Sequence, residues 1–257
     1  YLRDVWRRTT EKDALLGVGM TGIGSGRVQQ FDLEATSKLA VETNKYYAIE
    51  IGVNPSARIT TVKPSGTTSC VLGTSSGVHA WHNDYYIRRI RVGKNEAIYT
   101  YLTIHHPELV EDDFFKPETQ AVISIPQRAP NDGILRHETS LELLERVKDI
   151  YNRWIVPGHQ QGNNTHNVSC TVSVREEEWE EVGKWMWQNR EYYNGISVLP
   201  YFGGSYKQAP FEDIDKETFE GMFIKLKEVD LSNVVEVIDN TNLTGELACA
   251  GVSCEII

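Results

Sequence analysis

A strand-like run passes directly into a series of small hydroxyl residues in the stretch Arg58-Ile59-Thr60-Thr61-Val62-Lys63-Pro64-Ser65-Gly66-Thr67-Thr68-Ser69. The residues from Ile59 to Val62 are all β-branched, which is typical of a strand, and the following proline and glycine end it. A helix that starts after such a turn has unpaired backbone N–H groups, which together with the helix dipole favour an anion. The stretch therefore predicts either an ordinary capped turn or a phosphate site formed by Ser65, Gly66, Thr67, Thr68 and Ser69.

The segments around this stretch alternate between helix-like and strand-like patterns, which predicts an α/β fold. Leu33, Ala40 and Tyr47 recur every seven residues, so a helix is expected over 32–51, with Asp32 as its N-cap and Gly52 as its end. Further strands are expected at 87–92, 121–125, 168–172 and 196–201.

Three more helices are expected, two of them from start signals. Thr139 and Glu142 match a capping box and predict a helix over 139–155, and Ser173 with Glu176 predicts a second helix in the same way. Residues 215–226 form the third expected helix. Its inward-facing residues are expected to be Phe219, Met222, Phe223 and Leu226.

Composition limits the classes of function that the chain can have. The 257 residues include 26 Lys and Arg against 36 Asp and Glu, a formal charge of −10, so direct binding to nucleic acid is not expected. No apolar run approaches the roughly 20 residues of a membrane span, so no membrane partner is expected. The chain begins at Tyr1 without a signal segment, which predicts a piece of a longer cytoplasmic protein.

The four cysteines are too few for a disulfide scaffold. Cys70 and Cys170 are isolated, whereas Cys249 and Cys254 lie close together near the C-terminus, in a polar stretch that begins after Asp239. A dithiol on a flexible polar tail suits thiol–disulfide exchange, because exchange needs an accessible thiolate that can reach its partner. The alternative is two unrelated tail thiols.

Two other patterns have competing interpretations. Gly17-Val18-Gly19-Met20-Thr21-Gly22 has the spacing of a dinucleotide-binding turn, but the next expected helix starts only at Asp32, so a close-packed glycine turn is favoured. His79 and His82 lie in a loop without a cysteine nearby, and no metal site is expected there.

Arg88, Arg89 and Arg91 gather on one expected strand. An arginine that faces an anion is one interpretation of this cluster. A solvated charged edge is the commoner arrangement and is favoured here.

Several segments in their order along the chain together resemble ribonucleotide reductases, specifically the adenosylcobalamin-dependent (class II) branch. These segments are Leu16–Gly22, Lys63–Ser69, Ser75–His79, Tyr86–Arg91, Asn194–Pro200 and the terminal dithiol. The pairing of the hydroxyl-rich turn with the terminal dithiol is more specific than either part alone.

The resemblance implies a fold and a set of roles. Residues 1–238 would form the second half of a ten-stranded α/β barrel, and residues 239–257 a flexible tail. Ser65 to Ser69 would bind the substrate phosphate. Cys249 and Cys254 would re-reduce an active-site disulfide and pass the oxidation to thioredoxin or a similar dithiol. Adenosylcobalamin would be the cofactor, with no residues of this chain identified as its ligands.

The chain departs from the family in one respect, because the Asn-x-Cys-x-Glu segment of the radical-forming cysteine is absent from the sequence. The resemblance therefore implies a complementary N-terminal part and no turnover by this chain alone. In the family's reaction a cysteine thiyl takes the 3′ hydrogen of a ribonucleotide, and the 2′ hydroxyl leaves as water while two cysteines are oxidised.

Two alternatives remain open at this stage. A nicotinamide-dependent oxidoreductase would use the glycine run, and the absence of a thermal shift with NADH would count against it. A non-catalytic nucleotide-binding half-domain would differ from the enzyme in titrations with cobalamin or nucleotide, with and without an N-terminal partner.

Overall fold

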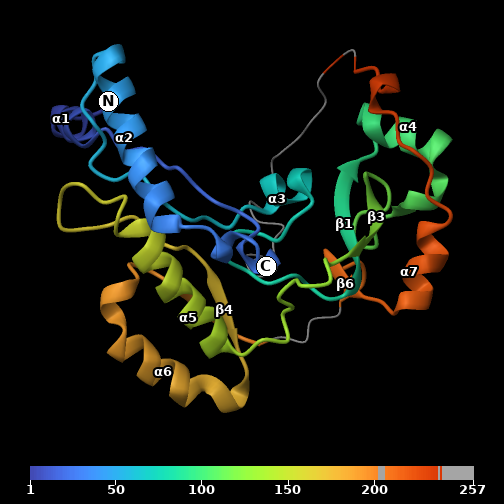
Figure 1. Cartoon of the computed structure of the whole chain (residues 1–257). Coiled ribbons are helices and arrows are strands. Elements are labelled where there is room, and N and C mark those ends of the chain that lie inside the picture. Colours follow the sequence, from blue (N-terminus) through green and yellow to red (C-terminus); the bar gives the residue numbers. More distant parts are fainter. Residues whose placement is uncertain (202–205, 237, 239–257) are drawn as a thin grey trace. The chain divides into compact units, whose positions relative to one another are not determined.

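The computed structural model describes residues 1–201, 206–236 and 238, apart from the side chain of Thr67 (Figure 1). The chain divides into two compact units. Unit 1 comprises the described residues within Tyr1–Trp81 and Asp132–Phe202, and unit 2 comprises those within His82–Asn131 and Gly203–Ile257. The expected tail, 239–257, lies outside the described residues, so the division at residue 238 stays a prediction.

Unit 1 is built around parallel strand segments that follow one another in chain order. Strands β4 (Thr171–Val174) and β5 (Ser197–Pro200) pair in parallel. Isolated parallel bridges extend this pairing from Val18 to Thr60 and from Val62 to Val168. An antiparallel bridge also joins Arg58 to His159, so the expected strand at 58–62 is present as three isolated bridges rather than as a continuous ladder.

These sheets confirm a mixed α/β fold. The described residues show four neighbouring parallel segments in unit 1 and a separate antiparallel sheet in unit 2. They do not show the ten-stranded barrel, and the half-barrel stays a prediction.

Helix α2 (Leu33–Ile51) confirms the expected helix and both of its ends. The Asp32 carboxylate accepts the N–H of Ala35 at 2.9 Å, and Gly52 adopts a left-handed conformation with φ 72°. The expected face is only partly buried, however: Leu33 is buried, whereas Tyr47 is 59% exposed. A seven-residue repeat drifts by about 20° per heptad on a straight helix, which carries Tyr47 away from the core.

Helix α5 (Ser140–Ile150) confirms the capping box and continues as a π-turn over Tyr151–Ile155. Thr139 and Glu142 exchange the two capping hydrogen bonds. Trp154 on the π-turn packs in the main core of unit 1 with the aliphatic residues of α5. Figure 1 shows α5 beside β4. The buried aliphatic residues at the centre of this core are Val62, Val78, Leu144, Val147, Ile150, Val168 and Val172.

The start of the next helix differs from expectation. A single 3₁₀ turn, Glu176–Glu178, precedes α6 (Trp179–Gln188), and Ser173 is still part of β4. The carboxylate that caps is Glu178, which accepts the N–H groups of Arg175 at 2.9 Å and of Ser140 at 3.0 Å. Glu178 therefore ties the start of α5 to the end of β4, a contact between distant segments that a local capping pattern does not contain.

Unit 2 has an antiparallel sheet in the order β2-β3-β1-β6. The central strands β1 (Tyr85–Gly93) and β3 (Gln120–Arg128) contain the two expected strands, and β2 (Val110–Asp112) and β6 (Phe211–Asp213) are short edges.

Three further helices are α1 (Asp4–Asp13) and α3 (Gly66–Leu72) in unit 1, and α4 (Ala97–His105) in unit 2. Helix α1 has no buried residues. Across the described part of the chain, no helix combines the length and apolarity that crossing a membrane requires.

Helix α7 (Lys216–Phe223) confirms the helix expected over 215–226, with Asp215 as its N-cap, but it is shorter and buries less than expected. Phe219 is buried, whereas Phe223 is 58% exposed. The expectation for Phe223 was wrong because α7 ends at that residue, so the apolar stripe does not continue as a packed helical face.

Candidate functional site

The hydroxyl-rich turn lies at the carboxyl end of a parallel segment, where ligands bind in parallel α/β folds. The chain leaves the bridge at Val62, passes through Lys63 and Pro64, and starts α3 at Gly66, with Ser65 as the N-cap residue. No side chain caps this helix start. A Cβ built on Gly66 would meet nothing within 4 Å, so the space beside the first turn is open.

The hydrogen bonds of this turn show which donors are already used. The N–H of Ser65 donates to the Ser76 hydroxyl at 3.0 Å, and the N–H of Ser69 donates to the Ser65 carbonyl at 2.8 Å. The Ser69 hydroxyl donates to the Gly66 carbonyl at 3.1 Å. The N–H groups of Gly66, Thr67 and Thr68 belong to the first helical turn and have no intrahelical acceptor. They are the donors that an anion would meet.

Residues 75–79 pack against the turn that precedes α3. The Thr21 hydroxyl donates to the Ser75 carbonyl at 3.0 Å and accepts the N–H of Gly77 at 2.9 Å. A Cβ on Gly77 would lie 2.4 Å from the carbonyl oxygen of Lys63, so only glycine allows this approach. The segment is thereby pressed against the turn that leads into α3.

A buried ion pair supports the same segment and was not anticipated from the sequence. The Arg146 guanidinium forms two 2.6 Å hydrogen bonds with the Glu138 carboxylate, and its Nε donates to the Val78 carbonyl at 3.0 Å. Arg146 is 8% exposed, on the row of α5 that includes Leu143 and Ile150. A charged residue within an otherwise apolar helical row is the signal that could have identified it.

His79 joins the segment to β4 as a neutral imidazole. Its Nε2 accepts the N–H of Thr171 at 3.2 Å, so the ring proton is on Nδ1, which contacts the Ser76 carbonyl at 3.1 Å. Burial lowers the pKa of His79 below its ordinary value of 6.5, and the nearby Arg146 charge acts in the same direction. The ring is therefore a structural hydrogen-bonding group and not a charged anion ligand.

The glycine run forms a packed turn and does not open a helix. Gly22 has φ 77°, and a Cβ there would lie 2.4 Å from the Thr74 hydroxyl oxygen. A Cβ on Gly24 would lie 2.3 Å from the His79 carbonyl oxygen. The next α-helix is α2, which starts only at Leu33. This is the arrangement of a close-packed glycine turn, and it lacks the helix start that would face a dinucleotide pyrophosphate.

The cysteines fall into two groups. Cys70 is exposed on α3 and Cys170 is buried, and both are free thiols. Burial raises the pKa of the Cys170 thiol to about 12, so this residue is unsuited to form a thiolate. Cys249 and Cys254, the expected redox pair, lie outside the described residues.

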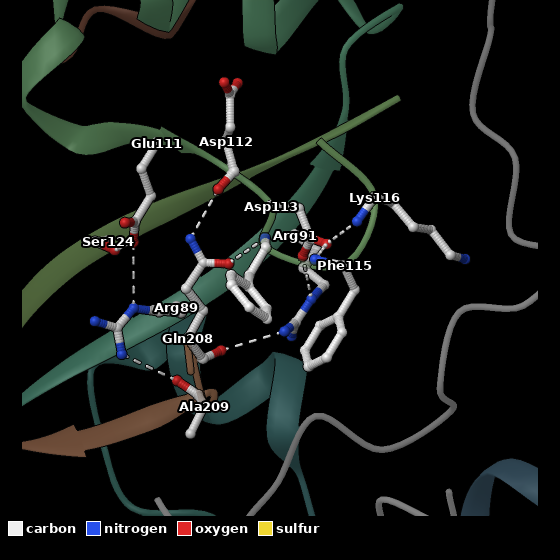
Figure 2. A network of polar contacts seen from close by, with 11 residues as sticks. Arg89, Arg91, Glu111, Asp112, Asp113, Phe115, Lys116, Ser124, Gln208 and Ala209 are labelled. Carbon is white, nitrogen blue, oxygen red and sulfur yellow. Dashed lines mark hydrogen bonds and ion pairs between the residues drawn. The ribbon is translucent and has the colours of Figure 1, made fainter. Parts of the chain in front are cut away.

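The arginine cluster of unit 2 belongs to a polar network that holds residues 208–209 on the sheet (Figure 2). Arg91 pairs with Asp113 at 2.9 Å and donates to the Gln208 carbonyl at 3.2 Å, and Arg89 donates to the Ala209 carbonyl at 3.2 Å. Arg89 also pairs with Glu111 and Glu212. Arg89 and Arg91 thus bind carboxylates and main-chain carbonyls within unit 2, and they form neither a solvated edge nor an anion site.

Asp113 and Gln208 are each held by several hydrogen bonds in this network. Burial alone would raise the pKa of Asp113, but the N–H groups of Lys116 and Phe115 and the Arg91 guanidinium hold it below its usual value. The Gln208 side chain donates to the Asp112 carbonyl at 2.8 Å and accepts the N–H of Phe114 at 2.7 Å (Figure 2). Within the described residues, no group of three or more His, Cys, Asp or Glu side chains is arranged to hold a metal ion.

Most of this chain is similar in sequence to known proteins that share one name. It is 32% identical over 233 residues to an adenosylcobalamin-dependent ribonucleoside-triphosphate reductase of Lactobacillus acidophilus, covering 87% of this chain and 30% of that protein. A reductase of the same name from Lactobacillus delbrueckii subsp. bulgaricus is 31% identical over 231 residues, covering 85% of this chain and 29% of the relative. A scan against models of protein families finds no match.

The fold gives the same result. The crystal structure of a B12-dependent (class II) ribonucleotide reductase superposes with a TM-score of 0.74 and 25% identity, covering 90% of this chain and 36% of that chain. The resemblance to the class II branch is therefore confirmed, and the relatives are the adenosylcobalamin-dependent enzymes that it named. The chain spans about 30% of the length of the curated relatives that it matches.

The packing of Gly77 gives a first prediction. Gly77 and Gly73 have similar left-handed φ values, 55° and 59°, but only Gly77 touches backbone, since a Cβ on Gly73 would meet nothing within 4 Å. Gly73→Ala should cost about 1–2 kcal/mol for the left-handed backbone. Gly77→Ala should cost about 1–3 kcal/mol more because it overlaps Lys63.

Urea unfolding followed by tryptophan fluorescence tests this difference, since all six tryptophans lie in unit 1. Equal losses of stability in the two variants would contradict the packing of residues 75–79 described above.

The neutral state of His79 gives a second prediction. Because its folded-state pKa lies below 6.5, its contribution to stability is complete above that pH. The contribution is lost as the pH falls toward the folded-state pKa, at up to about 1.4 kcal/mol per pH unit. His79→Gln should therefore reduce the difference in unfolding free energy of unit 1 between pH 7.5 and pH 5.5.

Two controls accompany this measurement. His137→Gln, which replaces another histidine of unit 1 at an exposed position, is the matched control whose pH dependence is compared with that of His79→Gln. Burial also lowers the pKa of His166, so some pH dependence should remain in His79→Gln. A slope that is unchanged in His79→Gln would show that the ring is not held neutral.

Proposed function

We propose that this chain is the C-terminal portion of an adenosylcobalamin-dependent ribonucleotide reductase, which reduces ribonucleotides to 2′-deoxyribonucleotides in a reducing cytoplasm. The observation that carries the proposal is the similarity to class II reductases over 85–87% of the chain, together with the fold similarity. Residues 1–238 are proposed to form the second half of the reductase barrel, and residues 239–257 a flexible redox tail.

Substrate binding is assigned to Ser65, Gly66, Thr67, Thr68 and Ser69. The free N–H groups of the first turn of α3, the open space beside Gly66 and the position at the carboxyl end of a parallel segment support a phosphate there. The role of this turn in the reaction is to bind and orient the nucleotide. The cation nearest in sequence is Lys63, which is exposed.

Re-reduction is assigned to Cys249 and Cys254. In each cycle their two thiols would reduce an active-site disulfide to two thiols, and the pair would itself become a disulfide. Thioredoxin or a similar dithiol would then reduce that disulfide. The exchange needs no residue of the described core, which agrees with the buried and unreactive state of Cys170.

The cofactor, when bound, supplies the radical. The groove of about 600 Å³ along α2 is apolar, whereas a corrin carries many amide side chains, so this groove does not fit the cofactor. The radical-forming cysteine is likewise absent from the sequence. The radical-forming cysteine is therefore assigned to a complementary N-terminal part, no residue of this chain is assigned to the cofactor, and this chain is expected to be inactive alone.

The decisive experiment mixes this chain with the polypeptide from the same genome that carries the Asn-x-Cys-x-Glu segment. Adenosylcobalamin-dependent formation of deoxyribonucleotide is expected from the mixture and from neither part alone. Reduction of ribonucleotides by the isolated chain, or none by the mixture in the presence of cofactor and dithiol, would refute the proposal.

The phosphate site gives a third prediction. Replacing Thr67 and Thr68 together with Val retains the approximate side-chain shapes and removes two hydroxyl groups. A lost hydrogen bond to a charged group costs about 1.5–3 kcal/mol, so nucleotide affinity of the assembled enzyme should fall at least about tenfold.

The matched control for this variant is Thr9→Val with Thr10→Val, another adjacent threonine pair, on the exposed helix α1. It should leave affinity unchanged in the same calorimetric titration. Unchanged affinity in the Thr67 and Thr68 variant would remove these residues from the site.

The redox tail gives a fourth prediction. Replacing Cys249 and Cys254 with Ser should leave about one turnover in the pre-reduced assembled enzyme, because only re-reduction needs the pair. Multiple turnover with thioredoxin should collapse, and a small dithiol that reaches the active site directly should restore part of the rate.

Cys70→Ser is the control and should cycle with thioredoxin as the wild type does. Product per enzyme in rapid-quench experiments measures both quantities. Failure of the first turnover would place the two thiols in the chemistry itself, and normal cycling with thioredoxin would make them incidental.

A further inference from the structure

A groove of about 600 Å³ runs along α2 in unit 1 and is open to solvent. Its floor includes Ala48 and Trp154, which are both buried. Its walls are large apolar side chains that remain exposed. They are Leu16 (43% exposed), Leu39 (61%), Tyr47 (59%), Ile51 (71%) and Val53 (51%).

The polar residues of the groove are largely engaged within the chain. Asn44 donates to the Ser56 hydroxyl at 3.1 Å and accepts the N–H of Ser56 at 2.8 Å, and the Ser56 hydroxyl donates to the Ala14 carbonyl at 2.6 Å. Asn54 donates to the Glu11 carbonyl at 2.9 Å. A polar ligand such as a nucleotide would therefore find few partners here, and the surface suits apolar side chains.

Helix α2 carries both buried and exposed apolar side chains. Leu33, Val41 and Ala48 are buried against unit 1, whereas Leu39 and Ile51 point to solvent. An exposed apolar groove of this kind marks an interaction surface.

The comparisons and the charge of the chain indicate what covers it. The relatives match this chain over 85–87% of its length, yet about 70% of their own length has no counterpart here. They therefore contain additional polypeptide that can cover such a surface. A second copy of this chain is disfavoured, because two molecules of formal charge −10 repel each other.

We propose that the groove along α2 is the docking surface for the complementary part of the reductase, the polypeptide that carries the Asn-x-Cys-x-Glu segment. Apolar side chains of that part fill the space between Leu39, Tyr47 and Ile51. This inference rests on the proposed function for the identity of the partner, whereas the surface itself is defined by the exposed residues of unit 1.

Two isoleucines of the same helix provide a matched test. Ile51 lines the groove and Ile49 does not, although they are similarly exposed, at 71% and 74%. The full chain and its variants Ile51→Glu and Ile49→Glu are titrated with the separately produced complementary polypeptide. Far-ultraviolet circular dichroism and tryptophan fluorescence check that each variant is folded, and ribonucleotide reduction by each mixture is measured in parallel.

Ile51→Glu should weaken binding at least about tenfold, because it places a charge in an apolar interface, and Ile49→Glu should change it less than about twofold. Equal effects of the two substitutions, or no binding by the wild-type chain, would overturn the docking surface. The docking surface would also be overturned if the wild-type chain self-associates and Ile51→Glu abolishes this self-association, because a second copy would then occupy the groove.

The parallel activity measurement separates the two proposals. If the two variants differ in binding as expected but no mixture reduces ribonucleotides, the docking surface is supported and the proposed function is contradicted. Reduction by the wild-type mixture with equal binding of both variants contradicts the docking surface alone.

Discussion

The candidate site depends on the buried ion pair between Arg146 and Glu138. The guanidinium forms two hydrogen bonds with the carboxylate and one with the Val78 carbonyl, so a main-chain atom of residues 75–79 is fixed to α5. Removing one partner of a buried pair leaves an uncompensated charge and typically costs about 3–5 kcal/mol. The pair is therefore a strong constraint on the position of this segment, whether or not it adds net stability to the fold.

The constraint passes from this segment to the turn that starts α3 through two contacts. Gly77 lies against the Lys63 carbonyl, and the Ser76 hydroxyl accepts the N–H of Ser65. The first contact requires a residue without a Cβ at position 77. The second uses the N–H of Ser65, so this group is not available to an anion. The remaining first-turn N–H groups are then held in a fixed geometry, which reduces the cost of ordering them when a ligand binds.

Local signals in the sequence were sufficient where the structure is local. The caps at Asp32 and Thr139 act within three residues, and both were predicted correctly. The interactions that position the candidate site join distant segments, such as Arg146 with Val78 and Glu178 with Ser140, 68 and 38 residues apart. Periodicity and capping patterns do not contain that information, although a charge in the apolar row of α5 marked one of the two partners.

The order of the parallel segments also bears on the nicotinamide alternative. In a doubly wound sheet the dinucleotide binds where the strand order reverses, beside the first strand and its glycine turn. In the described residues the segments at Val18, Thr60, Val168 and β5 neighbour one another in chain order, without a reversal. The glycine run therefore follows a segment at one end of this order and packs against residues 74–79 instead of a helix start. The hydroxyl-rich turn follows the second segment, at a carboxyl end, where a barrel places its ligand without needing a reversal.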